Sequence, residues 1–118
     1  MARVKRGLMA KKRHNKVFDR AEGYWGRKKN NFKSAHEQVM KSGQYAFRDR
    51  RSKKRDFRRL WIARISAGCS QNDIRYSAFI HGLGEAGIAI DRKILSELAI
   101  ADPSAFSTLV QKAKAATA

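Results

Sequence analysis

Apolar residues recur at helical spacing over one long stretch of the chain, which begins near residue 31. No proline interrupts this stretch, since the first one is Pro103. The stripe pauses at Arg48 and resumes at Leu60. We therefore expect one long helix from about Asn31 to Ser70, roughly 60 Å if it is unbroken. The apolar positions of its first part are Phe32, Ala35, Val39, Met40, Ala46 and Phe47.

The middle of this helix carries no apolar face. Residues 48–59, RDRRSKKRDFRR, hold eight basic and two acidic residues distributed on every side of a helix. A helix that is polar all round has no core to stabilise it. Asp49 can pair with Lys53 and Asp56 with Arg59, but most of the basic residues remain without an acid. This segment therefore needs a partner of opposite charge.

Three short helices are predicted after the long one, because helix-starting residues recur at short intervals. Ser77, Asp91 and the pair Asp102-Pro103 are the expected caps, and Gly87 ends the first short helix. No strand pattern is present. The apolar residues expected to converge in one small core are Trp61, Ile65, Phe79, Leu83, Leu95, Leu98, Phe106 and Leu109, with Ile94 on the same face as Leu95.

Charge divides the chain into two parts. Residues 1–59 hold 21 Lys and Arg against 5 acids, whereas residues 60–118 hold 6 against 5, and the total is +17. We predict an all-α protein in which an extended basic N-terminal arm and a long helix (1–59) lead into a small C-terminal helical bundle (60–118). So much positive charge suits a polyanion, because binding releases condensed counterions. Alone, residues 3–16 should be disordered.

The remaining features exclude several classes of function. A membrane partner is disfavoured, since there is no anchor beside the basic stretches and no apolar run that could span a bilayer or serve as a signal peptide. Cys69 can form no internal disulfide and is expected to be a small buried residue. His14, His36 and His81 are too widely spaced to hold a metal. We expect no cofactor, catalytic residue or small-molecule substrate.

One short motif resembles a dinucleotide fingerprint. Residues 82–87, GLGEAG, match G-x-G-x-x-G, and Asp102 lies about twenty residues further on. The fingerprint binds a pyrophosphate only when a strand leads into it and a helix begins on it. Here a helical pattern precedes the glycines. They are therefore expected to end a helix.

Aromatic residues interleave with Lys and Arg along the arm, at Phe18, Tyr24, Trp25, Phe32, Tyr45, Phe47 and Phe57. RNA offers both phosphates and unstacked bases to such a surface. For Tyr24 and Trp25 two interpretations are equally supported, a hydrophobic hinge against the long helix or stacking on a base or ribose.

Several segments resemble the bacterial-type family of large-subunit ribosomal protein twenty, which also occurs in chloroplasts and mitochondria. They are MARVKRG at 1–7, KRHNKVFDRAEGYWG at 12–26, YAFRDRRSKKRDFRRLWIARI at 45–65, residues 76–87 and DRKILSEL at 91–98. The likeness covers essentially the whole chain. It implies a cytoplasmic or organellar ribosomal protein whose arm and long helix penetrate 23S ribosomal RNA, whose C-terminal domain lies nearer the particle surface, and whose neighbour is ribosomal protein twenty-one.

The resemblance also implies a role in early assembly of the large subunit and, in some members, repression of translation of the protein's own messenger RNA. The chain departs from the family's pattern between Ala78 and Glu85, where more basic residues and an amide at position 81 are expected, and this departure argues against self-repression. A basic DNA-binding or nucleoid-associated regulator is the alternative from another class.

The residues expected to bind RNA fall into two groups. The arm and long helix contribute Arg3, Lys5, Arg6, Lys11, Lys12, Arg13, His14, Lys16, Arg20, Tyr24, Trp25, Arg27, Lys28, Lys29, Lys33, Arg48, Arg50, Arg51, Lys53, Lys54, Arg55, Arg58 and Arg59. The C-terminal part contributes Arg64, Asn72, Arg75, Tyr76, Ser77 and His81, which rest on polarity and on the resemblance.

Overall fold

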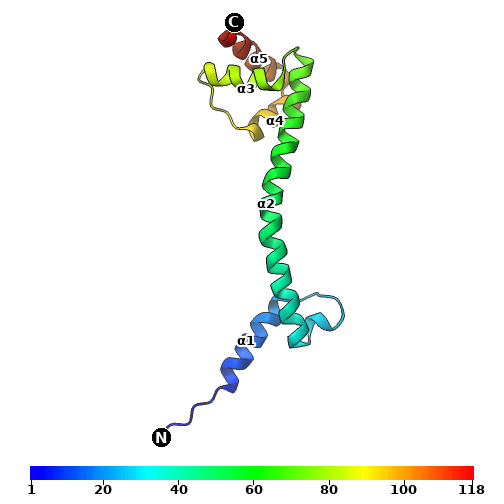
Figure 1. The fold of residues 1–118 in the computed structure, drawn as a ribbon, viewed down its shortest axis with the longest axis vertical. Helices are drawn as coiled ribbons and strands as arrows, with labels where there is room; N and C mark the ends of the chain where they lie inside the picture. The colour runs from blue at the N-terminus through cyan, green and yellow to red at the C-terminus, as the bar shows by residue number, and fades with distance from the viewer. The chain divides into compact units, whose positions relative to one another are not determined.

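The computed structural model describes residues 1–118, and all of its regular structure is helical (Figure 1). The predicted all-α class is therefore confirmed, as are the long helix and the three short helices that follow it. The elements in chain order are α1 (Gly7–Arg20), the 3-10 helix η1 (Gly26–Lys29), α2 (Phe32–Gln71), α3 (Tyr76–Glu85), α4 (Arg92–Ala101) and α5 (Pro103–Thr117).

The chain forms two compact units, Met1–Arg51 and Ser52–Ala118, and α2 contributes to both. In the first unit, aromatic rings hold α1 against the start of α2. The Phe32 ring stacks on His14 with centroids 3.8 Å apart and on His36 at 5.6 Å, and Phe18 meets it edge-on at 6.2 Å. This cluster is small. The fully buried apolar residues of the unit are only Ala21 and Ala35.

Helix α1 differs from the expectation of a structureless arm over residues 3–16. Its 14 residues are mostly good helix formers, so the backbone adopts a helix although none of its residues is buried. The apolar stripe of α2 is also less buried than predicted. Met40 and Phe47 are more than half exposed.

The second unit has a single apolar core, where α3 and α4 pack on α5 and the C-terminal part of α2 closes one side. Its buried residues are Ile65, Cys69, Phe79, Leu83, Leu95, Phe106, Val110 and Ala113. The Phe79 and Phe106 rings lie 5.1 Å apart. Cys69 is buried as predicted, and this burial raises the pKa of its thiol to about 11.

Two residues expected in this core lie outside it, because Trp61 and Leu98 are half-buried and do not belong to the core cluster. Ile94, which was expected on the apolar face of α4, is half exposed. Leu109 packs against the core without being fully buried. The reason is which face of α2 and of α4 is turned toward the core. Ile65 and Cys69, four residues apart, are the positions of α2 that face the core, and Leu95 is that of α4.

Two of the three predicted caps form. Asp91 accepts a hydrogen bond from the Ile94 amide at 2.8 Å, and Asp102 accepts one from the Ala105 amide at 3.1 Å, with Pro103 in the first turn of α5. The prediction for Ser77 was wrong, because α3 begins at Tyr76 and Ser77 already lies inside it. Arg75 occupies the cap position and makes no side-chain cap bond.

The glycines of residues 82–87 have two roles. They end α3, as predicted from the sequence, and they also allow close helix packing. Gly87 adopts a φ of +69°, and the Ile88 and Gly87 amides donate to the Leu83 and Gly84 carbonyls. This pair of bonds is a Schellman motif, which favours glycine in the left-handed position. Gly82 instead lets α5 approach α3 closely, since a Cβ there would lie 2.5 Å from the Ala113 carbonyl oxygen.

Candidate nucleic-acid interface

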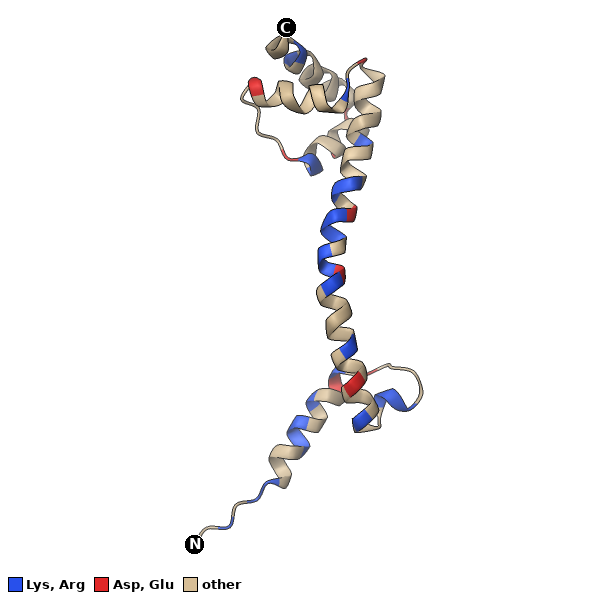
Figure 2. Cartoon of the chain, viewed as in Figure 1, with Lys and Arg blue, Asp and Glu red and all other residues tan.

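The basic side chains are exposed and gather in the first half of the chain. They lie before and along α1, in η1 and on α2, where residues 48–59 hold most of them, while α3, α4 and α5 are largely without them (Figure 2). Every Lys, Arg and His among the predicted RNA-binding residues is exposed. Phosphates can therefore reach these side chains without any opening of the fold.

Few of these cations are neutralised within the protein. Arg48 Nε pairs with Asp49 Oδ1 at 2.9 Å and Arg59 with Asp56 at 3.7 Å, and these are the only ion pairs of Lys or Arg in residues 1–118. The Asp56–Arg59 pair was predicted. The predicted pairing of Asp49 with Lys53 was wrong, because the adjacent Arg48 reaches that carboxylate and both its hydrogen bond and its negative charge raise the pKa of Arg48.

Exposed aromatic rings of α2 carry cations on their faces. The Tyr45 ring has Arg48 at 4.8 Å and Lys41 at 5.1 Å from its centroid. Arg51 lies 3.6 Å from the Phe47 centroid and also donates to the Phe47 carbonyl at 3.0 Å. Stacked guanidinium groups are held in place while their remaining N–H groups stay available. Lys41 was absent from the predicted set, although its spacing of four from Tyr45 is a usable signal.

The two interpretations of Tyr24 and Trp25 separate in the structure. Tyr24 is half-buried, and its hydroxyl shares a 2.7 Å hydrogen bond with that of Ser42 on α2. Tyr24 therefore contacts the long helix, as the hinge interpretation expects. Trp25 is 93% exposed and is free to stack on a base.

The six candidates of the C-terminal unit also divide. Arg64, Arg75, Ser77 and His81 are exposed, and His81 lies 3.8 Å from Glu85. Asn72 is occupied within the fold, since its amide donates to the Gly68 carbonyl and accepts from Ser107 at 2.8 Å. The Tyr76 hydroxyl accepts a 2.8 Å hydrogen bond from Arg92 Nε. The Asn72 and Tyr76 side chains therefore make hydrogen bonds within the second unit.

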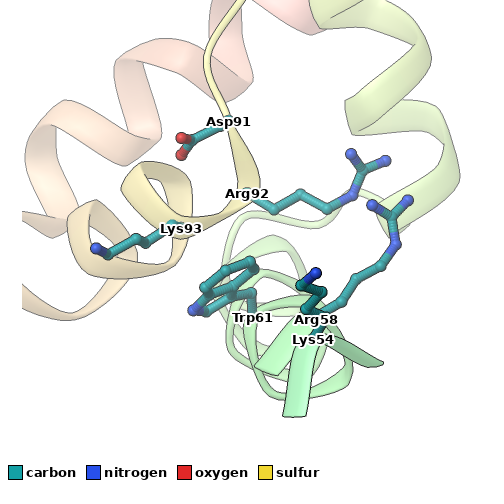
Figure 3. Close-up of a pocket in the computed structure, with 6 residues that line it drawn as sticks. All are labelled: Lys54, Arg58, Trp61, Asp91, Arg92 and Lys93. Atoms are coloured by element: carbon teal, nitrogen blue, oxygen red, sulfur yellow. The ribbon is translucent and has the colours of Figure 1, made fainter. Parts of the chain in front are cut away.

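An open groove of about 400 Å³ lies between α2 and the beginning of α4 (Figure 3). Four cations and one aromatic ring dominate its lining, which consists of Lys54, Arg58, Trp61, Asp91, Arg92 and Lys93. Sequence reasoning missed Arg92 and Lys93. Nothing in their local sequence indicates that the first turn of α4 faces Trp61, which lies 31 residues before Arg92.

No group of three or more His, Cys, Asp and Glu side chains is placed to hold a metal ion. No helix is at once long enough and apolar enough to cross a bilayer. The one titratable group with a large pKa shift is the buried Cys69 thiol, which faces the core.

Comparison with known proteins gives one consistent result. The family model described as "Ribosomal protein L20" matches residues 3–109. The chain is also similar to the large ribosomal subunit protein bL20 of Parvibaculum lavamentivorans, with 55% identity over 116 residues that cover 98% of each chain.

Proposed function

The chain belongs to the ribosomal protein L20 family, and from this membership we propose that it binds 23S ribosomal RNA directly and supports early assembly of the large subunit. The family is a class of structural, non-enzymatic ribosomal proteins.

One observation carries the proposal. Of the 21 Lys and Arg in residues 1–59, only Arg48 and Arg59 lie within ion-pair distance of a carboxylate. A surface of this kind repels itself in the free protein and gains affinity from every phosphate that replaces a condensed counterion. Because the cations follow α1, η1 and α2 in succession, we propose residues 1–59 as the RNA-penetrating part and residues 60–118 as the globular domain.

The mechanism is electrostatic and structural. RNA segments that repel one another are brought together when the basic residues of α1 and α2 neutralise both. The exposed ring of Trp25 supplies a face on which an unpaired base can stack. Within the assembled subunit we propose a contact with the neighbouring ribosomal protein twenty-one. The departure from the family's pattern at Ala78, His81, Gly84 and Glu85 argues against self-repression of translation.

Preference among polyanions tests the proposal. The full chain is titrated with large-subunit RNA and with a DNA duplex of equal phosphate content, at the same salt concentration. We expect tighter binding to the folded RNA, because it offers unpaired bases as well as phosphate-lined grooves, whereas the DNA duplex has no unpaired bases. Equal affinity for the two would contradict the proposal and favour the alternative of a DNA-binding or nucleoid-associated regulator.

A further inference from the structure

The groove beside Trp61 combines an excess of positive charge with an aromatic ring. Lys54, Arg58, Arg92 and Lys93 place four positive charges around it, against the single carboxylate of Asp91. That carboxylate is already engaged as the cap of α4. Cations gathered in one concave surface raise its positive potential and favour an anion there.

The aromatic floor of the groove is not part of the protein core. Trp61 is half-buried, and its nearest aromatic neighbour is Phe57 at 6.1 Å between centroids. In the view of Figure 3 its indole lies between Lys93 on one side and Lys54, Arg58 and Arg92 on the other. A tryptophan that packs only partly leaves a π-face available to another ring.

Arg92 is held in position from within the fold. Its Nε donates to the Tyr76 hydroxyl at 2.8 Å, and Tyr76 itself packs against the core of the second unit. The two terminal nitrogens of the guanidinium have no acceptor in the chain, so they can donate to an incoming oxyanion. Tyr76 is thus a positioning residue for Arg92.

We propose that this groove binds one unstacked nucleotide of single-stranded RNA, with the base on Trp61 and the flanking phosphates on Arg58, Arg92 and the two lysines. The inference deepens the proposed RNA-binding function and rests on it. The volume of about 400 Å³ falls within the roughly 300–1,000 Å³ common for small-ligand sites.

Another hollow of the chain provides a contrast. It belongs to the first unit and is lined by Phe18, Asp19, Glu22, Gly23, Lys29 and Asn30. Its two carboxylates face one lysine, so it lacks the excess of positive charge that a nucleotide needs. The groove beside Trp61 is therefore the better nucleotide site.

The test uses Trp61 itself as the reporter. In the full chain carrying Trp25→Phe, Trp61 is the only tryptophan. A single-stranded RNA oligonucleotide is titrated against it, alongside a blunt RNA duplex and an abasic oligonucleotide of equal phosphate number. Binding of each is followed by the anisotropy of a labelled strand. We expect the single strand to quench Trp61 fluorescence, and the duplex and abasic strand to bind without comparable quenching, because stacking needs a free base.

Charge variants complete the test. Arg58→Gln and Arg92→Gln are each expected to raise about tenfold the RNA concentration that gives half-maximal quenching, in line with the loss of one charge-assisted contact. Lys112→Gln removes the same charge from an exposed residue of α5 outside the groove and should leave that concentration unchanged. Tyr76→Phe should have a smaller effect in the same direction as Arg92→Gln.

The outcomes separate this inference from the function on which it rests. If the RNA binds by anisotropy but Trp61 is quenched equally by all three ligands or by none, the nucleotide site is wrong while RNA binding stands. If no RNA binds, both fail. Selective quenching that weakens in Arg58→Gln but not in Lys112→Gln supports the site.

Discussion

At the scale of single residues, the glycines of α3 have opposite roles although they lie two positions apart. Gly82 sits where α3 meets α5, and a Cβ there would approach the Ala113 carbonyl oxygen to 2.5 Å. Gly84 lies in the last turn of α3, and a Cβ there would meet nothing within 4 Å. The first glycine is required by packing and the second is not.

Substitution by alanine should therefore distinguish them. Gly82→Ala is expected to lower the free energy of unfolding by about 1–3 kcal/mol, because the two helices must separate to admit the methyl group. Gly84→Ala should raise it by about 0.5 kcal/mol, because alanine is the better helix former. Urea denaturation followed by circular dichroism measures both. Equal effects of the two substitutions would contradict the close approach of α3 and α5.

Asp102 links stability to pH. Hydrogen bonds from Ser104 and from the Ala105 amide hold its pKa below the ordinary value of 3.8. A group whose pKa is lower in the folded state stabilises that state above its unfolded pKa, and this contribution is lost as pH falls through the folded pKa. The stability contributed by Asp102 should therefore be present above about pH 4 and disappear below it.

Asp102→Asn is the matched comparison, since asparagine also caps helices but does not titrate in this range. We expect the thermal midpoint of the native protein to fall more steeply than that of Asp102→Asn between about pH 4 and pH 2. Parallel curves for the two proteins would show that the cap does not favour the charged form.

At the scale of elements, the sequence predicted α2 almost to the residue and also predicted three helices after it. Apolar spacing and the absence of proline suffice for this, because both act within one helix. The caps Asp91 and Asp102 were predictable for the same reason. Ser77 was not a cap, because a serine can begin a helix or lie in its first turn and only the tertiary arrangement decides.

The errors concern the faces of helices. Trp61 was expected in the core, yet Ile65 and Cys69 occupy that face and Trp61 lines the groove with Arg92 and Lys93. Periodicity identifies an apolar stripe but leaves its edges open, and a half-buried tryptophan fits either side of such an edge. The groove itself could not be predicted, since it depends on where α4 meets α2.

The basic residues in the middle of α2 should determine how strongly the affinity for RNA depends on salt concentration. Arg50, Lys53 and Arg55 are exposed and have no acid partner. Replacing all three by glutamine keeps the helix propensity and removes three charges. The slope of log affinity for RNA against log salt concentration should become shallower by about two to three, because fewer counterions are released. An unchanged slope would mean that this face of α2 does not contact phosphates.

Helix α1 and the residues before it should be the part of the free chain that is most sensitive to protease. Helix α1 has 14 residues and none is buried, and the ring contacts of His14 and Phe18 with Phe32 attach it to α2. A helix of about this length gains little stability from its own propensity in water. We expect trypsin to cut the free chain first within residues 1–20, and bound RNA to protect these sites. Limited digestion followed by mass spectrometry identifies the first cuts. A free chain resistant over this segment would contradict ordering of the arm on RNA.

At the scale of the whole molecule, charge and packing are separated along the chain. The unit Ser52–Ala118 contains the larger apolar core, whereas the first unit has only Ala21 and Ala35 fully buried among its apolar residues. Much of the first unit's stabilisation is thus expected to come from its partner. A protein built in this way suits a permanent place inside a ribonucleoprotein.

The most direct test of that place is the sedimentation of the tagged chain from its own cells on a sucrose gradient after a high-salt wash. Our account predicts that the chain stays in the large-subunit peak, because the proposed contacts of α1, α2 and the C-terminal unit with folded RNA would be too many for salt to release together. Release to the top of the gradient, or migration with DNA, would show loose binding to any polyanion and would contradict a structural role in the large subunit.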